Sequence, residues 1–152
     1  MAIPISRGWH IAAGCMTLFI LGNSLVPGTG SSHLSLSVVS MLRSWLSGMG
    51  LPSVFLTNLL VRKTAHFSEY ALLSIMVHNA FAEDSKLPIR RFAVMCVIPV
   101  LVASVDETIQ HFVPGRCGTP ADVLIDCCGA AFGILVCLMA RRVSRRVKTR
   151  HR

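Results

Sequence analysis

Four long apolar runs constrain the fold of this chain more than any other feature of its sequence. They cover residues 9–26, 64–82, 92–112 and 121–140. A helix needs about 17–25 predominantly apolar residues to cross a bilayer. The composition agrees, because 53% hydrophobic residues, 14% charged residues and a mean hydropathy of +0.61 lie outside the range of soluble domains. We therefore expect an all-α membrane protein, with the four runs forming a bundle of transmembrane helices and residues 1–152 forming one domain.

The first run has a second interpretation, because Arg7 precedes an apolar core of the length found in signal peptides. No convincing small-x-small cleavage site follows, since residues 21–30 read LGNSLVPGTG. We therefore interpret 9–26 as a retained span.

The segment 34–49 differs from the four runs because it is amphipathic. Serines alternate with apolar residues that recur at helical spacing, namely Leu34, Val38, Met41, Leu42, Trp45, Leu46 and Met49. We predict an interfacial helix that lies flat on the outer leaflet of the membrane, with Trp45 at headgroup depth. The alternative is that this segment begins a longer, unusually polar span.

The distribution of Lys and Arg predicts the orientation of the spans. The tail 141–152 holds seven of the 15 basic residues, and with four spans it shares one side with Arg7 and the loop 83–91. That side then carries 11 basic residues against four on the other, which places both termini in the cytoplasm. The net charge of +8 is therefore interpreted as a topology signal and an anchor for anionic lipids, and no nucleic-acid partner is expected.

Acidic residues are concentrated in or beside the apolar runs. The chain has seven acids, and five of them occupy such positions: Glu69, Asp106, Glu107, Asp122 and Asp126. An ionised group at the centre of a span costs at least about 2.5–3.5 kcal/mol on insertion scales, so these acids require partners or a hydrated cavity. The predicted topology places all five within about 10 Å of the outer boundary. We therefore predict an outward-facing polar pocket.

Helical spacing groups further residues with these acids. His66 and Tyr70 share a face with Glu69, and Gln110 aligns with both Asp106 and Glu107. In the fourth run, one ridge carries Asp122, Asp126, Gly129 and Gly133. Because Gly-x3-Gly faces let helices approach closely, we expect this ridge to pack tightly against another helix.

Two segments resemble the signature regions of the VanZ-like family of small bacterial membrane proteins: NLLVRKTAHFSEYALL (58–73) and DETIQHFVPGRCGTPADVLIDCCGAAFG (106–133). The matching residues are Lys63, His66, Tyr70, Asp106, Glu107, Gln110, Pro114, Gly115, Arg116, Asp122, Gly129 and Gly133. Asp126 departs from the pattern, because similar proteins commonly carry Asn there, and this leaves its charge state open. The resemblance implies a protein of the bacterial cytoplasmic membrane and an association with low-level teicoplanin resistance at the cell envelope. It implies no particular reaction.

The pocket is expected to engage the headgroup of a membrane lipid, either an anionic or a polyprenyl-linked one. The candidate binding residues are Lys63, His66, Glu69, Tyr70, Asp106, Glu107, Gln110, Arg116, Asp122 and Asp126. A guanidinium such as that of Arg116 is the preferred bidentate partner of phosphate or carboxylate, although a plain surface contact is the alternative. Asp122 has a structural alternative as the third residue of a helix that Thr119 caps and Pro120 begins.

Charge decides what the pocket is expected to hold. Five ionised acids against Lys63 and Arg116 would repel a phosphate, so we expect some acids to stay protonated near neutral pH, or else a cationic ligand. Metal ligands are present, including His66 and His111, but no HExxH or other preset spacing accompanies them. The two basic residues would also oppose a cation, so no metal and no cofactor are predicted.

Two other functional classes compete with a binding protein. A membrane-embedded hydrolase or transferase could act on a lipid-phosphate or glycan substrate, with Glu107, Glu69 or His66 as the candidate catalytic residue. In a purely structural protein, the polar residues would only hold the four helices together.

Overall fold

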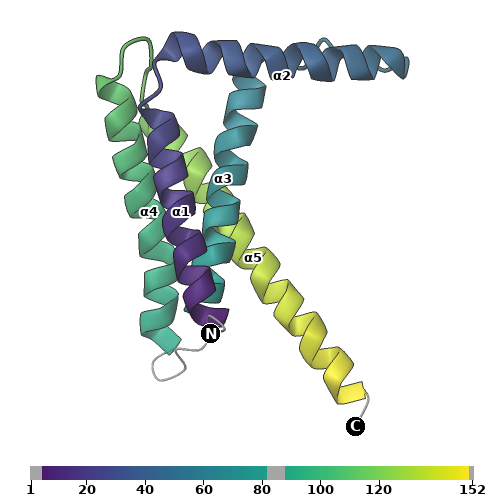
Figure 1. The fold of residues 1–152 in the computed structure, drawn as a ribbon. Coiled ribbons are helices and arrows are strands. Elements are labelled where there is room, and N and C mark those ends of the chain that lie inside the picture. Colours follow the sequence, from purple (N-terminus) through teal and green to yellow (C-terminus); the bar gives the residue numbers. More distant parts are fainter. Residues whose placement is uncertain (1–4, 82–87, 151–152) are drawn as a thin grey trace.

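The computed structural model describes residues 5–81 and 88–150, and this part of the chain contains helices and no strand. The helices are α1 (Ile5–Ser24), α2 (Gly28–Gly48), α3 (Asn58–Ala80), α4 (Pro88–Phe112) and α5 (Pro120–Arg150) (Figure 1). The all-α prediction is confirmed. Residues 83–87 of the predicted basic loop and the last two residues of the tail lie outside the described residues.

Two of these helices are long and apolar enough to cross a membrane, over Phe92–Phe112 in α4 and Pro120–Ser144 in α5. A third candidate is the bent pair α1 and α2, if the pair forms one span. The helix α3 has sufficient length, but His66 and Glu69 lower its hydropathy. Among the described helices, composition and length thus establish two or up to three candidate spans, where the sequence predicted four.

The helix α2 runs across one end of the other helices (Figure 1). The chain bends by 108° between α1 and α2. The predicted helix at 34–49 is therefore present, although it begins earlier, at Gly28 directly after Pro27. Many of its apolar side chains are uncovered, and Trp45 is 67% exposed, whereas Val39 is buried. Such a helix has the form expected of one that lies on a bilayer surface.

The helix α5 packs closely against α3 through its two ridge glycines. A Cβ atom at Gly129 would clash with the carbonyl oxygen of Phe67, and one at Gly133 would clash with that of Ala71. The predicted close approach of the Gly-x3-Gly face is confirmed. Because Asp126 lies on the same ridge one turn before Gly129, this packing brings its carboxylate against α3.

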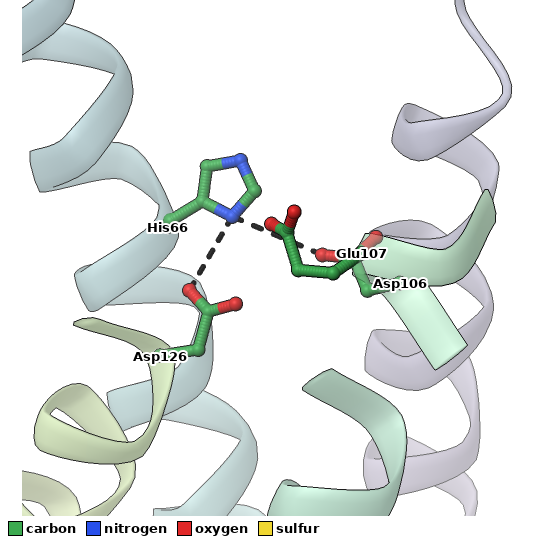
Figure 2. Close-up of side chains that lie close together, drawn as sticks. All are labelled: His66, Asp106, Glu107 and Asp126. Carbon is green, nitrogen blue, oxygen red and sulfur yellow. Dashed lines mark ion pairs between the residues drawn. The ribbon is translucent and has the colours of Figure 1, made fainter. Parts of the chain in front are cut away.

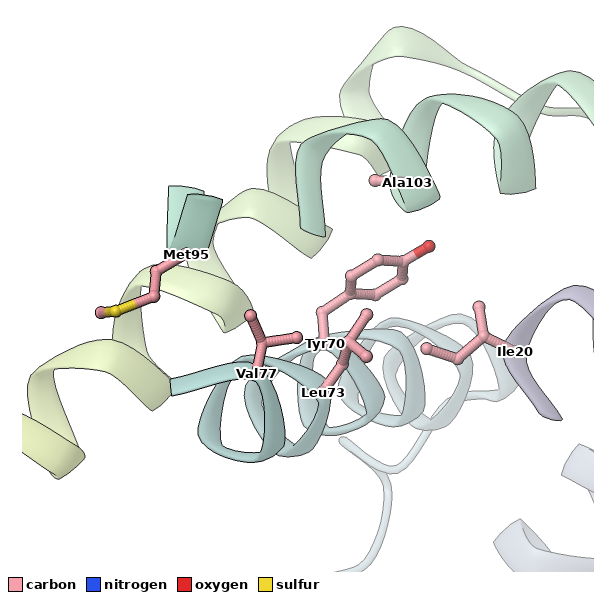
Figure 3. Packing of buried hydrophobic residues seen from close by; sticks show 6 residues of the cluster. All are labelled: Ile20, Tyr70, Leu73, Val77, Met95 and Ala103. Atoms are coloured by element: carbon pink, nitrogen blue, oxygen red, sulfur yellow. The ribbon is translucent and has the colours of Figure 1, made fainter. Parts of the chain in front are cut away.

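The apolar core lies between α1, α3 and α4 (Figure 3). It consists of Ile20, Tyr70, Leu73, Val77, Met95 and Ala103. By contrast, many large apolar side chains point outward, such as Leu18 and Leu124. A soluble monomer rarely exposes so much apolar surface, whereas lipid covers it in a membrane.

Candidate functional site

The corner Pro114-Gly115-Arg116 docks the α4–α5 connection onto the junction of α1 and α2. Gly115 has a φ of 75°, a left-handed conformation that favours glycine. The backbone N–H of Gly28 donates to the carbonyl oxygen of Pro114 over 3.0 Å. A Cβ atom at Gly28 would clash with the carbonyl of Gly115, so the two backbones meet directly.

Arg116 strengthens this contact through its side chain. Its Nε atom donates to the carbonyl oxygen of Val26 over 2.9 Å, and Nη2 donates to that of Asn23 over 2.8 Å. These carbonyls lie at and after the last turn of α1, where a helix leaves acceptors unpaired. Burial lowers the pKa of the guanidinium, but arginine remains charged. Arg116 therefore holds the α1–α2 junction in place.

Asp106 is completely buried near the C-terminal end of α4. The hydroxyl of Ser24 donates a hydrogen bond to its Oδ1, and that of Tyr70 donates to its Oδ2 over 3.3 Å. Tyr70 is thus both a core residue and a site residue. Sequence reasoning missed Ser24, although the polar pair Asn23-Ser24 interrupts the first apolar run at the depth of the other polar groups.

Glu107 points toward the connection between α4 and α5. Its Oε2 accepts from the backbone N–H of Thr119 over 3.0 Å. Gln110 bridges two groups, since its Nε2 lies 3.5 Å from Oε1 of Glu107 and 3.5 Å from the hydroxyl oxygen of Ser24. Both acidic neighbours on α4 are buried, and each has its own hydrogen-bond partners.

Asp122 belongs to the start of α5. The hydroxyl of Thr119 donates to its Oδ2 over 2.9 Å, and its other oxygen forms an ion pair with Lys63. The structural alternative for Asp122, an acid in the first turn after a threonine cap, is therefore realised. The same ion pair engages Lys63, another of the candidate binding residues.

Four of the predicted site residues converge from three helices (Figure 2). They are His66 on α3, Asp106 and Glu107 on α4, and Asp126 on α5, and we call them the His-acid cluster. The Nδ1 atom of His66 lies 3.4 Å from Oδ1 of Asp126 and 3.8 Å from Oδ2 of Asp106. One potential ligand atom from each of the four residues lies within 4.8 Å of the others.

A cavity of about 230 Å³ lies beside this cluster, between α1, α2 and α3. We call it the α1–α3 cavity. Its walls include apolar side chains such as Ile20 and Leu34, and polar ones from Arg62, His66, Glu69 and Arg116. The amide of Asn23 donates to Glu69 over 3.5 Å.

Sequence reasoning also missed Arg62, which precedes the matched Lys63. His111 instead lines a separate hollow beside Pro120.

The fold and the site define a class of protein: a helical membrane protein whose helices bring buried acids and a half-buried histidine together at one end. The family model described as VanZ/LLP1 matches residues 9–141, which is most of the chain. The chain therefore belongs to the VanZ/LLP1 family, which confirms the resemblance seen in residues 58–73 and 106–133 and extends it over α1 and α2. Curated proteins and solved structures gave no match.

Proposed function

We propose that this protein crosses the bacterial cytoplasmic membrane four times and binds the anionic headgroup of an envelope lipid in the α1–α3 cavity. The cavity opens toward the outer face in this proposal. The single observation that carries it is the composition of the cavity wall, where two guanidinium groups, those of Arg62 and Arg116, adjoin apolar side chains.

The proposed topology makes α1, α3, α4 and α5 the spans, with α2 on the outer surface and both termini in the cytoplasm. The 108° bend between α1 and α2 supports it, because a helix perpendicular to the spans lies parallel to the bilayer. The polarity of α3 is compatible with a span, since His66 points toward carboxylates of other helices (Figure 2). Polar groups in spans characteristically face the bundle interior.

The size of the cavity suits a headgroup better than a whole lipid. Pockets for drug-sized ligands hold about 300–1,000 Å³, and this cavity is smaller at about 230 Å³. Acyl chains would extend from it along the exposed apolar surface of α2, which includes Leu34 and Val38 at the cavity wall. In this arrangement the charged headgroup lies beside the guanidinium groups, and the acyl chains lie beside the apolar side chains of α2.

The charges also favour an anion in the cavity. Its wall carries Arg62 and Arg116 against one acid, Glu69, while His66 separates the cavity from Asp126 behind it. Arg116 already donates to two carbonyls, so Arg62 is the cation with more freedom to meet a ligand. A hydrogen bond to a charged group contributes about 1.5–3 kcal/mol, which corresponds to roughly a 10–100-fold change in affinity.

Lipid binding by the Arg62→Gln variant tests the proposal. Native mass spectrometry of the purified protein should find an anionic phospholipid or polyprenyl phosphate retained by the wild type and lost from the variant. Arg43→Gln is the matched control, because Arg43 lies on α2 and donates to the carbonyl of Leu56, away from the cavity. Equal retention by the wild type and both variants would contradict the proposed site.

A second candidate function is a hydrolase or transferase for a lipid-phosphate or glycan substrate. The observation in its favour is that His66 and Glu69 both line the cavity and offer proton-transferring groups. Turnover of such substrates by the purified protein, and its loss in Glu69→Gln, would establish this activity. Binding without turnover would leave the protein as a headgroup-binding protein.

The family resemblance suggests a cellular assay for either function. We propose that the cavity contributes to low-level teicoplanin resistance, because it would act on headgroups at the cell envelope. Deletion of the protein should then lower the inhibitory concentration of teicoplanin, and the Arg62→Gln gene should not restore it. In the competing structural role, site variants would lose membrane abundance together with any phenotype.

A further inference from the structure

We propose that the His-acid cluster is a binding site for one divalent first-row transition-metal ion, with Zn²⁺ and Mn²⁺ as the best-matched ions. This inference goes beyond the proposed headgroup function, and His66 is the residue that the two sites share. The ligand set is one imidazole nitrogen and three carboxylate groups, supplied by His66, Asp106, Glu107 and Asp126.

The separations of the donor atoms fit an ion of this kind. Zinc lies about 2.0–2.2 Å from nitrogen and oxygen ligands, which places tetrahedral donors about 3.3–3.6 Å from one another. The His66 Nδ1 atom lies 3.4 Å from Asp126 and 3.8 Å from Asp106. All four donor atoms lie within 4.8 Å of one another, so the wider pairs must contract to reach tetrahedral separations.

Asp126 provides an independent indication of a ligand. Its side chain is 0% exposed, and neither carboxylate oxygen accepts a hydrogen bond from any described residue. The carboxylate points at the imidazole of His66, and the second ring nitrogen lies on the far side of the ring (Figure 2). A buried carboxylate without hydrogen bonds is costly, and the ring of His66, 3.4 Å away, replaces only part of the water that it loses. A cation between Asp126 and His66 would compensate that loss.

Neighbouring groups already orient the proposed ligands. Ser24 and Tyr70 donate to the two oxygens of Asp106, and the backbone of Thr119 donates to Glu107. Ligating carboxylates in metal sites are commonly held by such outer hydrogen bonds, which fix their direction before the ion arrives. The outer donors come from α1, α3 and the α4–α5 connection, so the arrangement depends on the whole bundle.

From the sequence, Lys63 and Arg116 were expected to oppose a bound cation, but in the structure both side chains have other partners. Lys63 forms an ion pair with Asp122, and Arg116 donates to the carbonyls of Asn23 and Val26. Three ionised carboxylates and a neutral histidine carry three negative charges, and a divalent ion reduces this to one. Imidazole favours zinc, iron, copper or nickel, while carboxylate favours manganese and magnesium, so a mixed set suits Zn²⁺ or Mn²⁺.

Ion binding by untagged protein tests this inference directly. Purified protein in detergent is stripped with a chelator, dialysed, and titrated with ZnCl₂ or MnCl₂ by calorimetry, with metal content measured by mass spectrometry. We expect one ion per chain and a rise in the thermal unfolding temperature, because the ion binds the folded state alone. Asp126→Asn and His66→Gln should lower affinity about 10–100-fold or more.

A histidine outside the cluster provides a matched control. His111→Gln removes an imidazole that lines a separate hollow, and it should keep the wild-type affinity. The variant Asp126→Asn preserves shape, and its unfolding temperature without metal establishes that it folds; Glu107→Gln is a second ligand variant. Wild-type protein that binds neither ion more tightly than Asp126→Asn and His66→Gln overturns the site.

Failure of this inference is distinguishable from failure of the proposed function. Protein that retains anionic lipid but binds no ion contradicts the metal site alone. Protein that binds one ion through the His-acid cluster but retains no lipid contradicts the headgroup site alone.

Discussion

Gly129 on α5 lies directly against the backbone of Phe67 on α3, with no room for a Cβ atom between them. One turn earlier on α5, Asp126 faces His66, which lies one residue before Phe67 in the sequence. The helix contact and the His-acid pair are therefore parts of a single packing arrangement. Any change that separates the two helices also separates the proposed ligands.

Replacing Gly129 with Ala should destabilise the protein by about 1–3 kcal/mol, because the added methyl group forces α5 away from the carbonyl of Phe67. Thermal unfolding in detergent measures the effect. Gly22→Ala is the control, since a Cβ atom there meets nothing within 4 Å, and alanine favours a helix. Equal stability of the two variants would contradict the close α3–α5 contact.

Removing the two hydroxyl groups that donate to Asp106 should show that their contributions to the free energy of unfolding are coupled. Ser24→Ala and Tyr70→Phe each leave a buried carboxylate oxygen with one donor fewer, at a cost of about 1–3 kcal/mol. Because both hydroxyls bind one carboxylate, the double variant should differ from the sum of the single ones. A double-mutant cycle by thermal unfolding measures this difference, and strict additivity would argue against a shared partner.

Replacing Arg116 with Lys should weaken the contact with the α1–α2 junction almost as much as replacing it with Ala. The guanidinium reaches the carbonyls of Asn23 and Val26 through two separate nitrogens, whereas an ammonium offers one compact group. We expect both variants to increase proteolysis at the α1–α2 junction relative to wild type. Arg43→Lys serves as the control for a basic residue outside this contact. Wild-type resistance in Arg116→Ala would show that the junction does not depend on the side chain.

Cysteine labelling tests the proposed topology. In a variant that keeps Cys117 alone, a membrane-impermeant reagent should label intact cells, because the exposed thiol lies on the outer side in the proposed orientation. Single cysteines introduced at Lys86 and Lys148 should react only after permeabilisation. The reverse pattern would place the α1–α3 cavity on the cytoplasmic side and contradict the envelope role.

The sequence by itself determined the helices, the close-packing face of α5 and the grouping of polar residues at one depth. Apolar runs of this length can satisfy their backbone hydrogen bonds only as helices in a membrane, and residue spacing fixes which side chains share a helix face. The His66, Asp106 and Asp126 positions were therefore recognisable as parts of one site. The place of Asp122 in the first turn of α5 was also readable, since Thr119 and Pro120 mark the start of that helix.

Only the tertiary structure decided which of these groups meet. Spacing along a helix does not set its rotation against a neighbour, and here the contact of Gly129 and Gly133 with α3 turns Asp126 toward His66. Arg116 was predicted to meet a ligand, but it also binds main-chain carbonyls, acceptors that every residue carries and that no sequence pattern distinguishes. The proposed metal site could likewise not be predicted from spacing along the sequence, because its residues are close in space but come from three separate helices.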